Sequence, residues 1–174
     1  MHNRIVAMAG YARAAGSNDI LFTCSAFGAP IEAAAATAPI PILKPNEAKF
    51  NAAFALADRL AMITTSKRAA AGMEEEFRAA APARGSGAQI TSHFCVGAFD
   101  ARRAVDDAAH DRLVAQRAAG FAGADVILLG QFSKAGAAGQ VRAATDRLVL
   151  TSPDAAILEM RRSMEDTTPG STAC

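Results

Sequence analysis

Short apolar runs alternate along the chain with longer segments in which apolar residues recur every three or four positions. The short runs are typical of strands buried in a parallel sheet, and the longer segments have the periodicity of amphipathic helices. The pattern predicts strands over residues 19–23, 39–43, 59–65, 89–96, 125–129 and 148–150. Strands and helices that alternate in this way predict an α/β fold of doubly wound type with mostly parallel sheets.

Polar side chains mark where several of the predicted helices begin. Asn46, Ser66 and either Asp106 or Asp107 each precede a segment with helical periodicity. Side chains of these types accept hydrogen bonds from the first free backbone N–H groups of a helix. The last helix is expected to begin near Ser152.

A unit of strand, loop, helix, strand, loop and helix occurs twice. Asp19 begins the first copy and Glu47 stands 28 residues later at a helix start, whereas Asp125 and Asp154 are separated by 29 residues. The alternative explanation is a chance likeness between short strands that begin with an acidic residue. A true repeat predicts two intertwined lobes related by a pseudo-two-fold axis, within one unit over residues 1–166. The lobes would be approximately residues 1–58 with 148–166 and residues 59–147, followed by a flexible tail over 167–174.

Composition narrows the classes of protein. The 174 residues carry 18 basic and 17 acidic side chains, and their interspersion gives no basic face for nucleic acid. Three cysteines without a CxxC spacing argue against a disulfide framework and a zinc site. The apolar stretch over residues 5–9 is too short for a signal peptide or a membrane span. We therefore expect a cytoplasmic protein with reduced thiols and no membrane contact.

The best-marked reactive group is Cys24, where a predicted strand turns into a helix. Unpaired N–H groups around Ala26 to Gly28 would favour the thiolate and would also hold a carboxylate. The alternative is that Cys24 is a small core residue, since free cysteines are often buried. Ligands of open α/β sheets bind at the carboxyl ends of strands, where two further loops are expected. The facing loop offers Gln131, Ser133 and Lys134, and a third loop offers Thr64, Thr65 and Ser66.

Other polar groups are expected to be structural. No P-loop or GxGxxG sequence is present, so nucleotide binding has no support. We expect His110 and Asp111 to be solvated in the first turn of a helix, and Glu74, Glu75 and Glu76 to form a solvated helix face.

Four segments, in this order along the chain, resemble the aspartate/glutamate/hydantoin racemase superfamily. They are Ile20-Leu-Phe-Thr-Cys-Ser-Ala-Phe-Gly, Pro41-Ile-Leu-Lys-Pro-Asn-Glu-Ala, Asp125-Val-Ile-Leu-Leu-Gly-Gln-Phe-Ser and Leu150-Thr-Ser-Pro-Asp-Ala-Ala. The resemblance covers roughly residues 5–162, and the conserved order of the segments makes it more specific than any single motif.

The resemblance implies a cofactor-independent enzyme of two similar α/β lobes with a small carboxylate substrate held between them. In the family, two cysteines flank the α-carbon, and one removes its proton while the other returns a proton from the opposite face. Cys24 matches the first of these cysteines, and Ser25 matches a position that helps to hold the carboxylate. The loop from Thr64 to Ser66 matches another stretch that contacts the substrate.

The sequence departs from the family pattern in two ways. The second cysteine falls on Gln131, whose amide cannot transfer a proton near neutral pH. Family members also begin with a strand and a loop, whereas this sequence is expected to start at the helix that follows them. The first sheet would then be short by one strand and would have an exposed edge, which favours a homodimer.

The leading hypothesis is a racemase or isomerase that acts at the carbon alpha to a carboxylate, with Cys24 as acid or base. One thiol is sufficient for a decarboxylase, because a single proton donor quenches a carbanion, and it could also serve a lyase. The other hypothesis is a catalytically impaired remnant that binds a small carboxylate.

Overall fold

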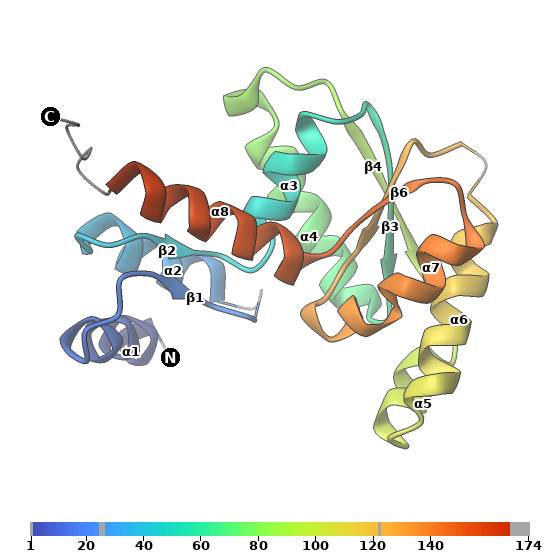
Figure 1. Cartoon of the computed structure of the whole chain (residues 1–174), viewed down its shortest axis with the longest axis horizontal. Helices are drawn as coiled ribbons and strands as arrows, with labels where there is room; N and C mark the ends of the chain where they lie inside the picture. The colour runs from blue at the N-terminus through green and yellow to red at the C-terminus, as the bar shows by residue number, and fades with distance from the viewer. Residues whose placement is uncertain (1, 25–26, 122, 168–174) are drawn as a thin grey trace, which may run out of the picture.

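The computed structural model describes residues 2–24, 27–121 and 123–167, which form two α/β lobes connected through the last helix (Figure 1). The strands are β1 (Ile20–Leu21), β2 (Ile42–Leu43), β3 (Arg59–Thr64), β4 (Gln89–Phe94), β5 (Val126–Leu129) and β6 (Leu148–Leu150). The α-helices are α1 (His2–Ala14), α2 (Gly28–Thr37), α3 (Glu47–Phe54), α4 (Lys67–Ala80), α5 (Ala98–Arg103), α6 (Asp107–Ala119), α7 (Ala138–Ala144) and α8 (Ser152–Thr167). Two 3-10 segments, η2 (Pro82–Arg84) and η3 (Phe132–Ala137), follow α4 and β5. The predicted α/β alternation is confirmed.

The second lobe is built on a four-stranded sheet in the order β4-β3-β5-β6, in which all neighbouring strands are parallel. Side chains of a strand alternate between the two faces of its sheet. Met62 therefore joins the core that Phe77 of α4 helps to form. Ile63 points the other way, into the core shared with Val114 of α6 and Val141 of α7. Because both faces are covered, the free backbone groups that can meet a ligand lie at the strand ends.

The first lobe is small. Its sheet has two short parallel strands, with Ile20 beside Ile42 and Leu21 beside Leu43. Its core joins the buried residues of α1, α2 and β2, which are Ile5, Ala9, Ile31, Ala34 and Ile42. The residues of β1 are only half-buried, so the expectation of a strand buried on both faces is wrong for this segment.

The chain returns to the first lobe through α8, which crosses between the lobes in Figure 1. Ala155 and Ala156 of α8 pack with Ala48 of α3 and with Leu21 of β1. β6, which begins at Leu148, pairs with β5 in the second sheet. The crossing lies after β6, where Ser152 begins α8.

Helix caps partly follow the prediction. Ser66 Oγ accepts a hydrogen bond from the N–H of Ala69, and Asp106 caps α6 through the N–H of Ala109. Asn46 stands before α3 but makes no capping bond, so the prediction for this side chain is wrong. Its amide instead forms hydrogen bonds with the half-buried Glu76 and the buried Lys49, in the site described below.

Two further expectations about polar residues are corrected. His110 is buried, and its Nδ1 lies 2.7 Å from Asp111 Oδ1, so this pair is not solvated. In the acidic trio of α4, Glu75 is exposed but Glu74 and Glu76 are half-buried, because each meets another element. Glu74 accepts the backbone N–H of Ser92 at 3.1 Å.

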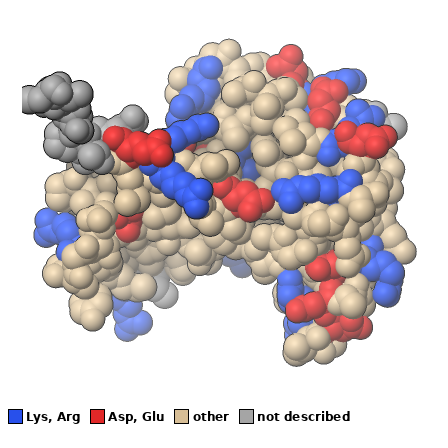
Figure 2. All heavy atoms as spheres, viewed as in Figure 1, with Lys and Arg blue, Asp and Glu red and all other residues tan. Residues whose placement is uncertain are grey.

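Positive and negative side chains are interspersed on the face of the molecule shown in Figure 2, as the near-neutral composition leads one to expect. Within the described ranges, no helix is long and apolar enough to cross a membrane.

Candidate active site

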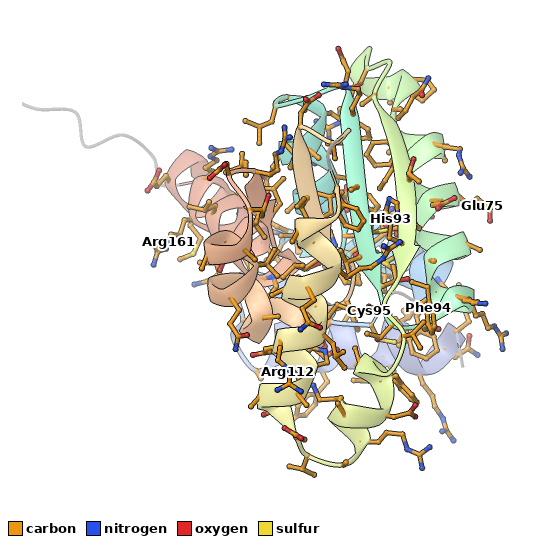
Figure 3. The ribbon with its side chains drawn as sticks, turned by 90° about the vertical axis from the view of Figure 1, so that its right-hand side faces the viewer. Glu75, His93, Phe94, Cys95, Arg112 and Arg161 are labelled. Atoms are coloured by element: carbon orange, nitrogen blue, oxygen red, sulfur yellow. The ribbon has the colours of Figure 1, made fainter. Side chains whose placement is uncertain are left out.

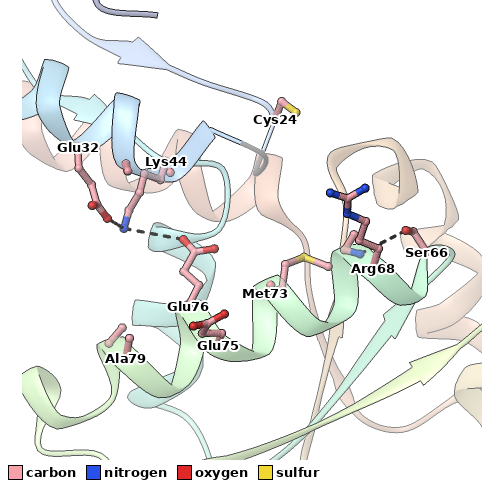
Figure 4. Close-up of a pocket in the computed structure, with 14 residues that line it drawn as sticks. Cys24, Glu32, Lys44, Ser66, Arg68, Met73, Glu75, Glu76 and Ala79 are labelled. Carbon is pink, nitrogen blue, oxygen red and sulfur yellow. Dashed lines mark hydrogen bonds and ion pairs between the residues drawn. The ribbon is translucent and has the colours of Figure 1, made fainter. Parts of the chain in front are cut away.

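A cleft of about 1070 Å³ lies between α2 of the first lobe and α4 of the second (Figure 4). Cys24, in the loop after β1, lines this cleft and is exposed, so it is not a core residue. Ser66 and Arg68, at the start of α4, line it from the second lobe. The only predicted site residues that the structure brings together in this cleft, within its described part, are therefore Cys24 and Ser66.

Arg68 extends from the first turn of α4 toward the loop that carries Cys24 (Figure 4). No hydrogen bond or ion pair engages its guanidinium among the described residues. The N-terminus of α4 adds the positive end of the helix dipole to the same side of the cleft. This end of the cleft thus combines a thiol, a free guanidinium and a helix N-terminus.

The other end of the cleft carries a chain of charges. Lys44 Nζ lies 2.8 Å from Glu32 Oε1 and 3.9 Å from Glu76 Oε1, as the dashed lines of Figure 4 mark. Burial acts to lower the pKa of Lys44, but its hydrogen bond to Glu32 and the charges of Glu47, Glu32 and Glu76 together raise it. Lys44 is consequently a fixed cation that ties α2 and β2 to α4.

Asn46 continues this chain into the interior. Its Nδ2 donates to Glu76 Oε2 at 3.0 Å, and its Oδ1 accepts from Lys49 Nζ at 3.4 Å. Lys49 lies in α3, is 0% exposed and donates to the carbonyl oxygens of Leu129 at 2.9 Å and Gly130 at 3.1 Å. Burial lowers the pKa of Lys49 to about 7, with the charge of Glu76 opposing the shift and that of Lys134 adding to it.

The loop after β3 is divided between the interior and the cleft. Thr64 ends β3 and is fully buried, and its hydroxyl oxygen has no hydrogen-bond partner in the described part of the chain. Thr65 is half-buried and accepts a hydrogen bond from Lys134 Nζ at 3.0 Å. Ser66 lines the cleft while it caps α4.

The loop after β5 lies beside the loop after β3. The N–H of Gly130 donates to the carbonyl of Ile63 at 2.9 Å, and a Cβ at this glycine would meet the same oxygen at 2.9 Å. Only glycine allows so close an approach. Gln131 is half-buried with its Oε1 unpartnered among the described residues, and Ser133 is exposed with its carbonyl oxygen bound by Arg102. Neither Gln131 nor Ser133 lines the cleft that holds Cys24.

Lys134 is a second buried amine, with 0% of the residue exposed. Burial lowers its pKa to about 7, opposed by the nearby Cys95 and reinforced by the charge of Arg102. Cys95 follows β4, the edge strand labelled with His93 and Phe94 in Figure 3, and it is buried. Burial raises the pKa of the Cys95 thiol, which suits a packed side chain rather than a nucleophile.

The predicted contacts of Ser25 and Ala26 lie outside the described residues. Sequence reasoning missed Lys44, Arg68, Glu76 and Lys49. For α4 the spacing in the sequence was informative. The residues Arg68, Gly72, Glu75, Glu76 and Ala79 recur every three or four positions, which places them on one side of the helix, and that side lines the cleft. For Lys49 there was none, since its carbonyl partners lie 80 and 81 residues away.

Comparison with known proteins assigns the fold. No family model and no curated protein sequence matches the chain. Solved structures do match it, and the chain has the α/β fold of the aspartate/glutamate/hydantoin racemase superfamily. At the level of the fold, the resemblance seen in the sequence is confirmed.

Three of these structures illustrate the match. Allantoin racemase from Pseudomonas fluorescens superposes with a TM-score of 0.69 at 19% identity, over 91% of this chain and 68% of its own. Glutamate racemase from Bacillus anthracis gives 0.69 at 15% identity, over 97% of this chain and 67% of its own. Arylmalonate decarboxylase gives 0.64 at 17% identity, over 99% and 77%. The chain therefore spans about two thirds of the length of the two racemases.

Proposed function

We propose that this protein is a cofactor-independent enzyme of the racemase and isomerase type, which acts at the carbon alpha to a carboxylate with Cys24 as acid or base. The observation that carries the proposal is the exposed thiol of Cys24 in a cleft between the lobes, opposite Ser66 and Arg68. The fold of racemases and of a decarboxylase supports the same class of chemistry.

The substrate would be a small carboxylate. Arg68 is free to bind a carboxylate in bidentate fashion, and the N-terminus of α4 beside it favours an anion. One solved structure with this fold is a glutamate racemase from Francisella tularensis in complex with D-glutamate, which is a small carboxylate of this kind. Substrate contacts from Ser25, Ala26, Thr64, Thr65 and Ser133 remain part of the proposal.

The proposed reaction begins with proton transfer at the α-carbon. The Cys24 thiolate would take the α-proton, and the carboxylate held by the cationic end of the cleft would share the negative charge that develops. Racemisation then needs a proton donor on the opposite face. Gln131 stands where the family resemblance places a second thiol, and its amide cannot supply that proton near neutral pH.

This departure gives specific support to a second candidate, a one-thiol decarboxylase or lyase. In a decarboxylase the carboxylate of a malonate leaves as CO₂, and the Cys24 thiol protonates the resulting carbanion from one face. A second base is not needed. The similarity to arylmalonate decarboxylase covers 99% of this chain.

The first experiment is α-proton exchange in D₂O, followed by NMR, over a panel of amino acids and substituted malonates. Wild type, Cys24→Ala and Cys95→Ala would be compared, with Cys95 as the matched control because its thiol is buried outside the cleft. We expect exchange or decarboxylation in wild type and in Cys95→Ala, and a loss of about 10²-fold or more in Cys24→Ala. Exchange that persists in Cys24→Ala would refute the role of this thiol. A folded wild type that turns over nothing would identify the catalytically impaired remnant.

A further inference from the structure

Lys134 is a buried amine that the proposed reaction leaves unused. It lies in η3, immediately after β5, and its Nζ donates to Thr65 Oγ1 at 3.0 Å. This is the only hydrogen bond of the amine within the described part of the chain, and no carboxylate there forms an ion pair with it. Burying an ammonium without a carboxylate is costly, so such a lysine is retained at a cost in stability.

The surroundings of Lys134 suit proton transfer better than permanent charge. Burial lowers its pKa to about 7, and the charged or titratable groups that face it are Cys95, Arg102 and Lys49. Near neutral pH the nitrogen therefore changes readily between ammonium and amine. A neutral lysine amine beside a hydroxyl is an arrangement that enzymes use to activate the hydroxyl.

Thr65 connects this amine with the cleft. Lys134 has no exposed surface, but Thr65 is half-buried and stands next to Ser66, which lines the cleft. Thr65 belongs to the second lobe, whereas Cys24 belongs to the first. Thr65 thus stands one residue from the cleft lining on the second-lobe side, and Cys24 lines the cleft from the first lobe.

Two unpartnered oxygens lie in the same loops as this pair. Thr64 Oγ1 and Gln131 Oε1 are both buried atoms without a hydrogen-bond partner in the described residues. Gln131 precedes Lys134 by three residues and occupies the position that the family resemblance gives to the second thiol. Unsatisfied buried acceptors are uncommon in folded proteins, and the Lys134 amine in the same pair of loops has donors to spare.

We propose that Thr65 and Lys134 form a proton relay that serves the face of the α-carbon opposite Cys24, in place of the second thiol. The inference rests on the proposed function. In the forward step the Thr65 O–H gives its proton to the carbanion while the Lys134 ammonium gives a proton to the same oxygen. One C–H bond and one O–H bond form, one O–H bond and one N–H bond break, and the amine is left neutral. Thr65 is the catalytic residue, and Lys134 acts through it.

The test uses each enantiomer of an amino acid substrate separately in D₂O. The variants are Lys134→Met, Thr65→Val and Thr65→Ser, with Lys67→Met as the matched control because Lys67 is an exposed lysine of the neighbouring α4. Lys134→Met and Thr65→Val should lose racemisation by about 10²-fold or more. Both should still exchange the enantiomer whose α-proton faces Cys24, with retention of configuration. Thr65→Ser, which keeps the hydroxyl, should retain racemisation.

The possible outcomes separate the two proposals. Exchange of one enantiomer without racemisation in wild type would keep the role of Cys24 and overturn the relay. Equal loss for both enantiomers in Lys134→Met would overturn the relay too, because it is the result of a purely structural role. Exchange of neither enantiomer by folded wild type would overturn the relay, and if no malonate is decarboxylated either, the proposed function itself is overturned.

A second measurement needs no substrate. The chain has four lysines, so ¹⁵N- and ¹³C-lysine NMR should resolve the Lys134 amine, assigned by its loss in Lys134→Met. We expect its signal to titrate near neutral pH and to shift in Thr65→Val. A Lys134 amine that stays charged above pH 10 would overturn the relay, because it could not exchange protons during turnover at neutral pH.

Discussion

The buried amine of Lys49 gives a quantitative prediction about how stability depends on pH. The change is Lys49→Met, which removes the amine but keeps an unbranched side chain of similar length. In wild type the amine is fully buried and its pKa falls from 10.5 to about 7, mainly because burial penalises the charged form. The unfolded chain therefore binds a proton that the folded chain lacks, over the range between these two values.

The sign follows from this difference in bound protons. The free energy of unfolding rises with pH wherever the unfolded state binds more protons, so wild type should gain stability as the pH rises above 7. The slope from Lys49 is about 1.4 kcal/mol per pH unit, which amounts to roughly 2.5 kcal/mol between pH 7.5 and 9.5. Lys134 makes a pH-dependent contribution to stability of similar size, because its pKa is also lowered to about 7. Lys49→Met should lose the contribution of Lys49 and keep that of Lys134.

The assay is urea unfolding followed by circular dichroism at several pH values in this range. The absolute stability of Lys49→Met is not diagnostic, because the carbonyls of Leu129 and Gly130 lose a donor in the variant. The informative quantity is the difference between wild type and variant as a function of pH. Lys67→Met, at an exposed lysine, is the control and should run parallel to wild type.

Parallel curves for wild type and Lys49→Met would refute the reasoning. They would mean that Lys49 stays an ammonium in the folded protein, with the two carbonyls and Asn46 Oδ1 replacing the water that burial removes. The structure would then hold a permanent charge at the junction of the lobes rather than a group that titrates.

Two more predictions concern the loops of the site. Ser66→Ala should lower stability by about 1 kcal/mol through loss of the α4 cap, while Ser66→Asp, which keeps a capping oxygen, should restore most of it; equal stability of the two variants would argue against the capping role. Gly130→Ala should cost roughly 1–3 kcal/mol, because its Cβ would meet the backbone oxygen of Ile63 at 2.9 Å; unchanged unfolding by heat or urea would show that β3 and β5 can separate at no cost.

The sequence by itself determined the class of fold and the leading candidate for the reactive group. Apolar runs bounded by polar residues locate strands wherever local pattern and burial agree, as for β3 and β5. The cap at Ser66 was predictable because a hydroxyl and the backbone N–H that it binds lie three residues apart. Cys24 was singled out because it lies where a predicted strand turns into a helix, and four segments in a fixed order add a resemblance to a known family, whose fold the solved structures confirm.

Only the tertiary structure decided how the remaining groups are used. Asn46 resembles a helix cap in sequence, but its amide binds Glu76 and Lys49, because packing of α3 beside α4 offers stronger partners than the helix end. Lys134 was expected in a loop that meets the ligand and Lys49 was not singled out, yet both are fully buried with lowered pKa values. Their partners come from strand ends distant in the sequence, and local pattern carries no information about such contacts. A pKa depends on burial and on neighbouring charges, and both are set when the two lobes pack together.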